Sequence, residues 1–203
     1  MPHMTPVLSE TVAVGAFNPR IITPSWLVKN GVVQEDKWLE DILDSMPIEE
    51  NGFPLGGLGW DVDWDRLIVS AEASERDCGE ATAKVIELLR HTPVSAIGHN
   101  FHYTCPVSDW PVPAIPRLGS RTATDLRATE TRWTGRFDRE GVVIEVELLY
   151  TPKADDVVAV RTNFERSSGK DWESAVSAAR SFAADRTAAH ELARTLFGLE
   201  VTP

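Results

Sequence analysis

Cysteine is scarce in this chain, and the sequence shows no metal-binding spacing around it. Cys78 and Cys105 are the only two cysteines among 203 residues, and no C-x-x-C motif occurs. The sequence therefore predicts neither a zinc site nor a thioredoxin-like redox site, and we expect no metal or other cofactor. We expect reduced thiols in a cytoplasmic protein, with a Cys78–Cys105 disulfide as the alternative.

Long apolar runs and basic residues are also lacking. No stretch of about 20 apolar residues occurs, so no membrane-spanning helix is predicted. The first residues lack the basic start and the apolar run of a signal peptide. The chain has only 20 lysines and arginines but 31 aspartates and glutamates, which gives a formal net charge of −11. Such a charge repels phosphate backbones and anionic lipids, so we expect neither nucleic-acid binding nor membrane binding.

Apolar and acidic residues alternate strictly in the segment Trp60-Asp61-Val62-Asp63-Trp64-Asp65. A strand sends successive side chains to opposite faces, so the two tryptophans and Val62 are predicted to share a buried face. Asp61, Asp63 and Asp65 would share the other face. We interpret that face as solvated, with an acidic contact or ion site as the alternative. The whole segment 60–72 is predicted to be one strand.

Two segments have the spacing of amphipathic helices. Apolar residues recur at helical intervals after Ser74, and Pro93 cannot be accommodated inside a helix, which predicts a helix over about 75–91. An alanine-rich stripe between a capping Ser168 and the stop at Gly198 predicts a longer helix over 169–197.

The remaining regular segments read as strands, with two irregular tracts between them. Strands are predicted over residues 9–17, 60–72, 94–104, 130–137, 142–150 and 157–165. The irregular tracts are 19–57, in which short helical turns are expected near 24–26 and 38–43, and 105–128. Short connections favour antiparallel neighbours. We therefore predict a single α+β domain over 1–203, with a curved, mainly antiparallel sheet and the two helices, about 75–91 and 169–197, packed on one face.

The clearest hairpin joins 130–137 to 142–150 through Asp138-Arg139-Glu140-Gly141. Matching of apolar and charged faces selects its register. We predict that Phe137 lies opposite Val142, Trp133 opposite Val146 and Arg132 opposite Glu147. This register gives one apolar face and one ion-paired face.

A possible polar site is formed by His99, His102 and Cys105. On a strand, a spacing of three places the two histidines on opposite faces. His99 is therefore most simply a core histidine with one hydrogen-bond partner. A cysteine–histidine pair would require the thiolate within hydrogen-bond reach of an imidazole. The alternative is that Cys105 is a small apolar residue that opens a loop.

The proline-rich tract after Cys105 offers candidate partner contacts. Trp110 lies next to Pro111 and Pro113. Proline lowers the entropy cost of ordering an exposed segment, and tryptophan is favoured at binding hot spots. Trp26 is a second candidate in the first irregular tract. The alternative is a loop folded back over the domain's own core, which would bury Trp110.

Three functions remain open at this stage. The leading hypothesis is a non-catalytic protein-binding or assembly subunit of a cytoplasmic complex, acting through sheet-edge and loop contacts. The first alternative is a small hydrolase, metal-dependent or using the cysteine and histidines. The second is a small-ligand-binding domain with an apolar cavity lined by Trp133, Ile144 and Phe182. The sequence does not indicate the oligomeric state.

Overall fold

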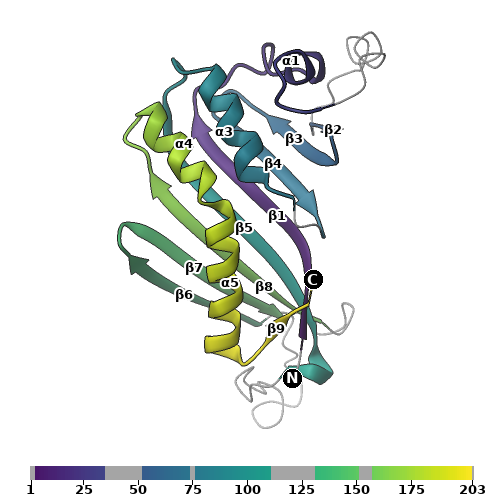
Figure 1. Cartoon of the computed structure of the whole chain (residues 1–203). Coiled ribbons are helices and arrows are strands. Elements are labelled where there is room, and N and C mark those ends of the chain that lie inside the picture. The colour runs from purple at the N-terminus through teal and green to yellow at the C-terminus, as the bar shows by residue number, and fades with distance from the viewer. Residues whose placement is uncertain (1–2, 35–51, 74–75, 111–130, 151–156, 203) are drawn as a thin grey trace, which may run out of the picture.

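The computed structural model describes residues 3–34, 52–73, 76–110, 131–150 and 157–202 (Figure 1). Nine strands and four α-helices lie in these ranges, together with the 3-10 turn Val107–Asp109. The strands are β1 (His3–Gly15), β2 (Phe53–Leu55), β3 (Leu58–Val62), β4 (Arg66–Glu72), β5 (Val94–Pro106), β6 (Thr131–Arg139), β7 (Val142–Tyr150), β8 (Val157–Ser167) and β9 (Glu200–Val201). The helices are α1 (Pro24–Lys29), α3 (Cys78–Leu88), α4 (Trp172–Arg180) and α5 (Phe182–Phe197). The chain is therefore α+β with a mainly antiparallel sheet, as predicted.

The strands form one open sheet in the order β2-β3-β4-β1-β5-β8-β7-β6, and β9 pairs with β1. Neighbours along this order are antiparallel. Only the short contact of β9 with the start of β1 is parallel among the described pairs. The two long strands β1 and β5 lie at the centre of the sheet, and β2 and β6 lie at its ends.

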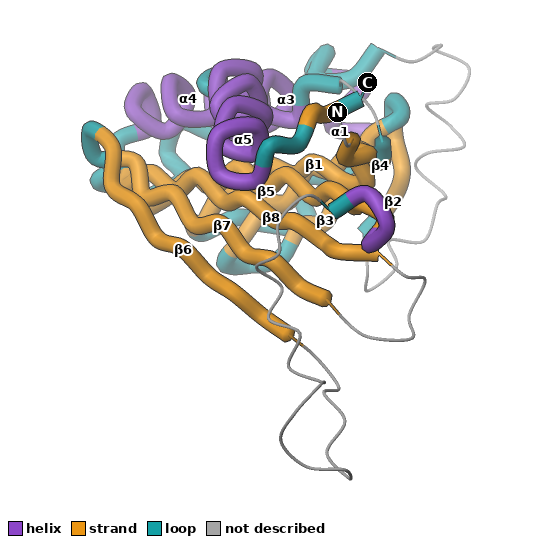
Figure 2. Tube along the Cα trace, turned by 90° about the horizontal axis from the view of Figure 1, so that it is seen from below, coloured by secondary structure: helices purple, strands orange, loops and turns teal. Residues whose placement is uncertain are grey.

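The sheet has two unequal faces. Figure 2 shows α3, α4 and α5 in one layer on one side of it, which we call the helix face. On β5, the rings of His99 and Phe101 contact Phe182 of α5, with ring centroids 5.3 and 5.1 Å apart, so odd-numbered β5 residues point to the helix face. Even-numbered residues such as Asn100 point to the opposite, open face.

The core lies between the helices and the sheet. Its largest fully buried side chains are Met4, Phe17, Ile22, Leu27, Trp60, Leu67, Ile86, Ile97, Phe101, Phe164, Phe182 and Leu199. Both cysteines are buried and free, so the disulfide alternative does not hold.

The predicted strand 60–72 is instead a hairpin. β3 ends at Val62 and β4 begins at Arg66, and Trp60 pairs with Val69 across the turn. Trp60 is buried as expected, but Trp64 lies in the turn and is 57% exposed. The alternation therefore predicted which side chains are buried only within β3, because the chain reverses direction after Val62.

Both predicted helices need correction. The helix expected over 75–91 spans Cys78–Leu88, and Asp77 is its N-cap, with its carboxylate accepting a hydrogen bond from Glu80 N at 2.9 Å. Ser74, after which the helical spacing was expected to begin, lies outside the described residues. The helix expected over 169–197 is divided into α4 and α5 at Ser181. Its cap is Asp171, which accepts from Ser174 N at 2.8 Å.

The predicted hairpin exists, but its register was wrong. Phe137 lies opposite Ile144 and Trp133 opposite Leu148. Glu140 and Gly141 both take positive φ, of 55° and 81°, so the turn has only two residues. The shift equals two residues, so each side chain keeps its predicted face. Arg132 lies opposite Leu149, but its guanidinium still reaches Glu147 at 3.0 Å.

The irregular tracts contain more structure than predicted. The helical turn expected near 24–26 is α1, where Thr23 caps the helix by accepting from Trp26 N at 3.2 Å. The tract 19–57 also contains β2, which pairs with β3. The turn predicted near 38–43 and most of the tract 105–128 lie outside the described residues.

Candidate functional site

The structure does not bring the three groups of the predicted polar site together. His99 and Cys105 lie on the helix face and are buried, whereas His102 lies on the open face. Six residues of β5, or about 20 Å of strand, separate His99 from Cys105. Burial and the nearby Asp109 carboxylate raise the pKa of the Cys105 thiol, which opposes formation of a thiolate. In this part of the chain the geometry therefore gives no cysteine–histidine pair.

His99 instead belongs to a buried polar network. Its Nδ1 lies 2.6 Å from Asp185 Oδ2 on α5. Arg166 of β8 donates from two nitrogens to the two oxygens of the same carboxylate, each at 2.5 Å. Burial alone would raise the pKa of Asp185, but the hydrogen bonds from His99 and Arg166 outweigh it and lower the pKa.

This network ties α5 to the two strands beneath it. Asp185 lies one turn after Ser181, where α4 ends, so it holds the start of α5 at the helix break. His99 Nε2 is buried and has no hydrogen-bond partner in the described residues. Because His99 itself is 0% exposed, we interpret the network as structural. Asp185 was not among the predicted site residues, although it lies inside the apolar stripe, three residues after Phe182 and four before Ala189.

The three aspartates do not form a common face. Asp61 is half-buried on the open face of β3, opposite Ile68. Asp63 and Asp65 are exposed in the β3–β4 turn, where the Asp63 carboxylate accepts from Trp64 N at 2.7 Å. No group of three histidine, cysteine, aspartate or glutamate side chains is placed to hold a metal ion among the described residues.

The predicted partner-binding tryptophans are only partly accessible. Trp110 is half-buried, and its ring lies 5.6 Å from that of Phe197 at the end of α5. Trp26 is half-buried and packs against the core from α1. Trp110 thus packs partly against the core, and Pro111 and Pro113 lie outside the described residues.

The β6 edge is a more accessible surface. β6 pairs with β7 along all nine of its residues and with no other strand in the described ranges. On its helix face, Trp133 and Phe137 are 45% and 39% exposed. A Cβ at the intervening Gly135 would lie 2.6 Å from the Trp133 indole and 3.2 Å from the Phe137 ring, so both aromatic rings close over this glycine. The result is an exposed aromatic surface on a strand whose outer edge pairs with none of the described strands.

The other side of β6 is basic. Arg132, Thr134 and Arg136 alternate with the aromatic residues, and Arg139 follows at the turn. All three arginines are exposed. Arg132 is partly neutralised by Glu147 at 3.0 Å. By strand alternation this side of β6 carries Arg132, Arg136 and Asp138, whereas Arg139 lies on the helix face, so it is weakly basic in a chain whose net charge is −11.

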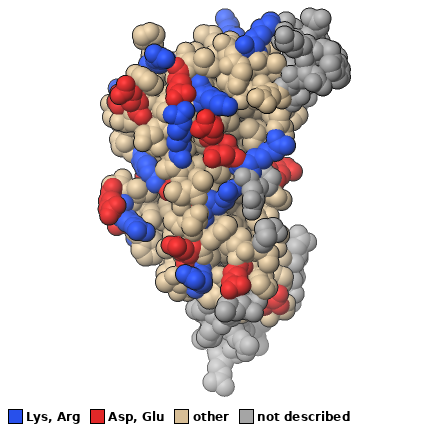
Figure 3. Space-filling model, in the orientation of Figure 1, with Lys and Arg blue, Asp and Glu red and all other residues tan. Residues whose placement is uncertain are grey.

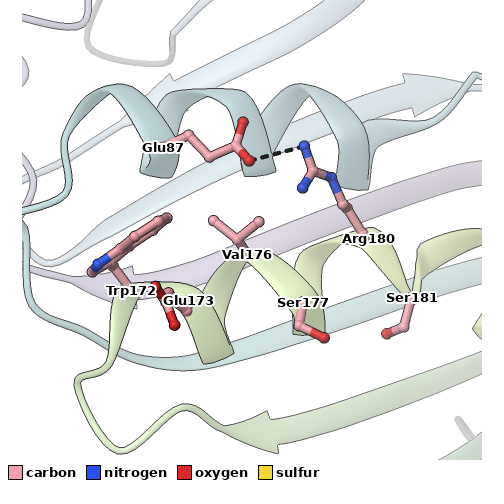
Figure 4. Close-up of a pocket in the computed structure, with 7 residues that line it drawn as sticks. All are labelled: Glu87, Trp172, Glu173, Val176, Ser177, Arg180 and Ser181. Carbon is pink, nitrogen blue, oxygen red and sulfur yellow. Dashed lines mark ion pairs between the residues drawn. The ribbon is translucent and has the colours of Figure 1, made fainter.

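A groove of about 510 Å³ lies between α3 and α4 (Figure 4). Trp172 and Val176 supply its apolar surface, and Arg180 closes one side by an ion pair with Glu87 at 3.0 Å. Figure 3 shows acidic and basic side chains interspersed over this helix-bearing side of the molecule. Because Arg180 and Glu87 are already paired across the two helices, we assign the groove to helix packing.

The groove between α3 and α4 is not lined by Trp133, Ile144 or Phe182, the three residues of the expected apolar cavity. Phe182 is 0% exposed and Ile144 6% exposed, so both are closed within the core. Trp133 lies at the edge instead.

Two further findings limit what the chain resembles. None of the described helices is long and apolar enough to cross a membrane. Neither the models of known protein families nor the curated proteins contain a match to this chain.

Proposed function

We propose that this protein is a non-catalytic binding subunit that captures an extended segment of a partner protein as an additional strand along β6. The observation that carries this proposal is the nine-residue outer edge of β6, which pairs with no described strand and has Trp133 and Phe137 exposed beside it. Strand addition supplies affinity through main-chain hydrogen bonds and specificity through alternate side chains. The other end of the sheet, β2, has only three residues and offers a much shorter edge.

The side chains of β6 define the partner. A strand paired with β6 would place alternate residues beside the aromatic rings on the helix face and beside Arg132 and Arg136 on the open face. The complementary segment therefore alternates apolar and acidic residues. Charged residues on an edge strand can also protect it from aggregation. The two exposed aromatic rings favour a binding role for this edge, because protection from aggregation alone would not require them.

A cytoplasmic location forms part of this proposal. The two buried free thiols are compatible with a reducing compartment. Trp26 and Trp110 remain predicted secondary contacts, although both also pack against the core.

The test uses a backbone change that leaves the hairpin intact. Counted from the closing pair Arg139–Val142, the alternation of an antiparallel ladder turns the N–H groups of Thr134 and Arg136 toward the free edge. Thr134→Pro removes one outward donor, whereas Thr134→Val keeps it. The probe is a nine-residue peptide that alternates valine and glutamate, and binding is followed by NMR chemical-shift changes on β6.

We expect the valine–glutamate peptide to bind the wild type and Thr134→Val, and binding to Thr134→Pro to weaken at least tenfold. A valine–lysine peptide of the same length serves as the charge control and should bind more weakly than the glutamate peptide. Shift changes that avoid β6, or equal binding by Thr134→Pro, would overturn the proposal. The circular dichroism spectrum confirms that each variant is folded.

A further inference from the structure

The residues of β6 are arranged symmetrically about the midpoint of the strand. Gly135 is the middle one of its nine residues, and Trp133 and Phe137 lie two residues to either side of it. Arg132 and Asp138, which carry opposite charges, lie three residues to either side. An antiparallel copy of the same strand, centred on Gly135, would therefore face each of these residues with a complementary one.

The backbone of β6 permits this pairing. The N–H and C=O groups of Thr134 and Arg136 point to the outer edge, whereas those of Gly135 point to β7. With a two-fold axis at Gly135, Thr134 of one copy lies opposite Arg136 of the other, and these two residues can exchange both of their main-chain hydrogen bonds. The contact uses all nine residues of β6 and is closed, because both copies contribute the same surface.

On the helix face, the pairing brings aromatic rings together. Trp133 of each copy lies opposite Phe137 of the other, in the type of antiparallel pair whose Cα atoms are only about 4.5 Å apart. In the single chain these two side chains are 45% and 39% exposed. Gly135 lies opposite its own copy at the axis, so no Cβ separates the four rings that lean toward it. Pairing would thus remove exposed aromatic surface from water.

On the open face, the pairing joins opposite charges. Arg132 of each copy lies opposite Asp138 of the other, which gives two ion pairs related by the axis. Within the single chain, Glu147 lies 3.0 Å from Arg132 and 3.6 Å from Arg161, so two guanidinium groups share one carboxylate. A second carboxylate opposite Arg132 is therefore favourable.

Other registers of the same two strands are less favourable. An axis at Thr134 would place Arg132 opposite Arg136, and an axis at Arg136 would place this residue opposite its own copy. Like charges directly opposite each other are destabilising. With the axis at Gly135, Arg136 faces Thr134 of the second copy and keeps Glu145 as its neighbour on β7.

We propose that two copies of this chain pair through β6 in an antiparallel, two-fold symmetric dimer centred on Gly135. Residues directly opposite each other share a face, so the two sheets join into one and both helix layers lie on the same side of it. The dimer uses the edge assigned to partner capture, and its consequence for capture rests on the proposed function. The dimer is then the resting form, and an incoming strand must displace the second copy.

The experiment reverses the two charges separately. Arg132→Asp leaves two acidic positions that repel each other in a dimer, and Asp138→Arg leaves two basic ones. When the two variants are mixed in equal amounts, each acidic position meets a basic one again. Sedimentation equilibrium measures the oligomeric state. Glu165→Arg, at an exposed position of β8, is the control for the change in charge, and circular dichroism confirms that each variant is folded.

We expect the wild type and Glu165→Arg to dimerise with the same affinity. Each β6 variant alone should dimerise about tenfold more weakly, because two attractive pairs become repulsive, and the mixture should recover the wild-type affinity. A wild type that stays monomeric at about 1 mM would overturn the dimer. A mixture that associates no better than the separate variants would overturn the antiparallel register.

The valine–glutamate peptide separates this inference from the proposed function. We expect the peptide to dissociate the wild-type dimer and to bind the monomeric Asp138→Arg variant more tightly than the wild type. If the peptide binds a wild type that is monomeric, the dimer is overturned and strand capture stands. If the wild type dimerises with the expected charge pattern but the peptide does not bind Asp138→Arg, the dimer stands and strand capture is overturned.

Discussion

At the scale of single residues, the Asp185 carboxylate should govern both stability and its dependence on pH. Replacing Asp185 with asparagine removes the charge that pairs with Arg166 and accepts from His99. Breaking a buried pair costs roughly 3–5 kcal/mol, and we expect roughly 2–4 kcal/mol here because Arg166 keeps some contact with solvent. The measurement is the free energy of unfolding in urea at pH 7. Glu191→Gln, on the exposed side of α5, is the control and should change little.

The pH dependence of that difference has a defined sign. The pKa of Asp185 is lower in the folded state than its ordinary value near 3.9, so its contribution to stability is fully present above about pH 4. It disappears as the pH falls through the lower folded value. The stability gap between wild type and Asp185→Asn should therefore narrow below pH 4. If the difference in stability between wild type and Asp185→Asn did not change with pH, the loss would arise from packing and not from the charge of Asp185.

Residue patterns predicted some burial correctly and failed where the chain turns. Trp60 is buried and His99 has a single side-chain partner, as the alternation of β3 and β5 implied. Trp64 fits the same alternation but lies in a turn, because nothing in an alternating sequence marks where a strand reverses. Asp185 was missed because an ionised residue in an apolar stripe can either interrupt the buried face or be paired within the core. Only the positions of His99 and Arg166 in the fold decide between these two possibilities.

At the scale of elements, the packing of α3 on α4 and α5 depends on a glycine. A Cβ at Gly79 would lie 2.1 Å from Ala179 O and 2.5 Å from Phe182 Cβ. Gly79→Ala should thus force α3 away from the other two helices and destabilise the protein by roughly 1–3 kcal/mol, as overpacking does. In an exposed helix the same change would be stabilising. Urea unfolding checks the sign, with Ser177→Ala on α4 as the control; an unchanged or higher stability would contradict this close packing.

The break between α4 and α5 illustrates what a helical period cannot reveal. The apolar stripe continues from Ala179 through Phe182, so the sequence predicted one helix across both. Ser181 donates from its hydroxyl to Ala178 O at 2.7 Å, a back-bond that commonly bends helices. The pattern identified the buried side of both helices but not their change of direction.

At the scale of the whole molecule, the sheet joins segments that no local pattern connects. The sequence predicted the first strand over 9–17, whereas β1 begins at His3 and lies between β4 and β5. Its early residues were missed because they lack alternation, and β9 was missed because it has only two residues. Strand order also depended on tertiary packing: the hairpin β6–β7 was accessible to local rules, but the β3–β4 hairpin and the central β1–β5 pair were not.

The pairing of β9 with β1 predicts that both parts of the chain unfold with the core. Met4 is 0% exposed, and Thr202 donates to its carbonyl from both N and Oγ1, at 3.0 and 3.1 Å. Met4→Ala should therefore lower the free energy of unfolding by about 2–4 kcal/mol, within the range for buried methionine, and leave the denaturant slope unchanged. Val7→Ala, at a position that is 44% exposed, should cost much less. If Met4→Ala had no effect on global unfolding, β9 and the start of β1 would open independently, because residues outside the cooperative unit do not contribute to its stability.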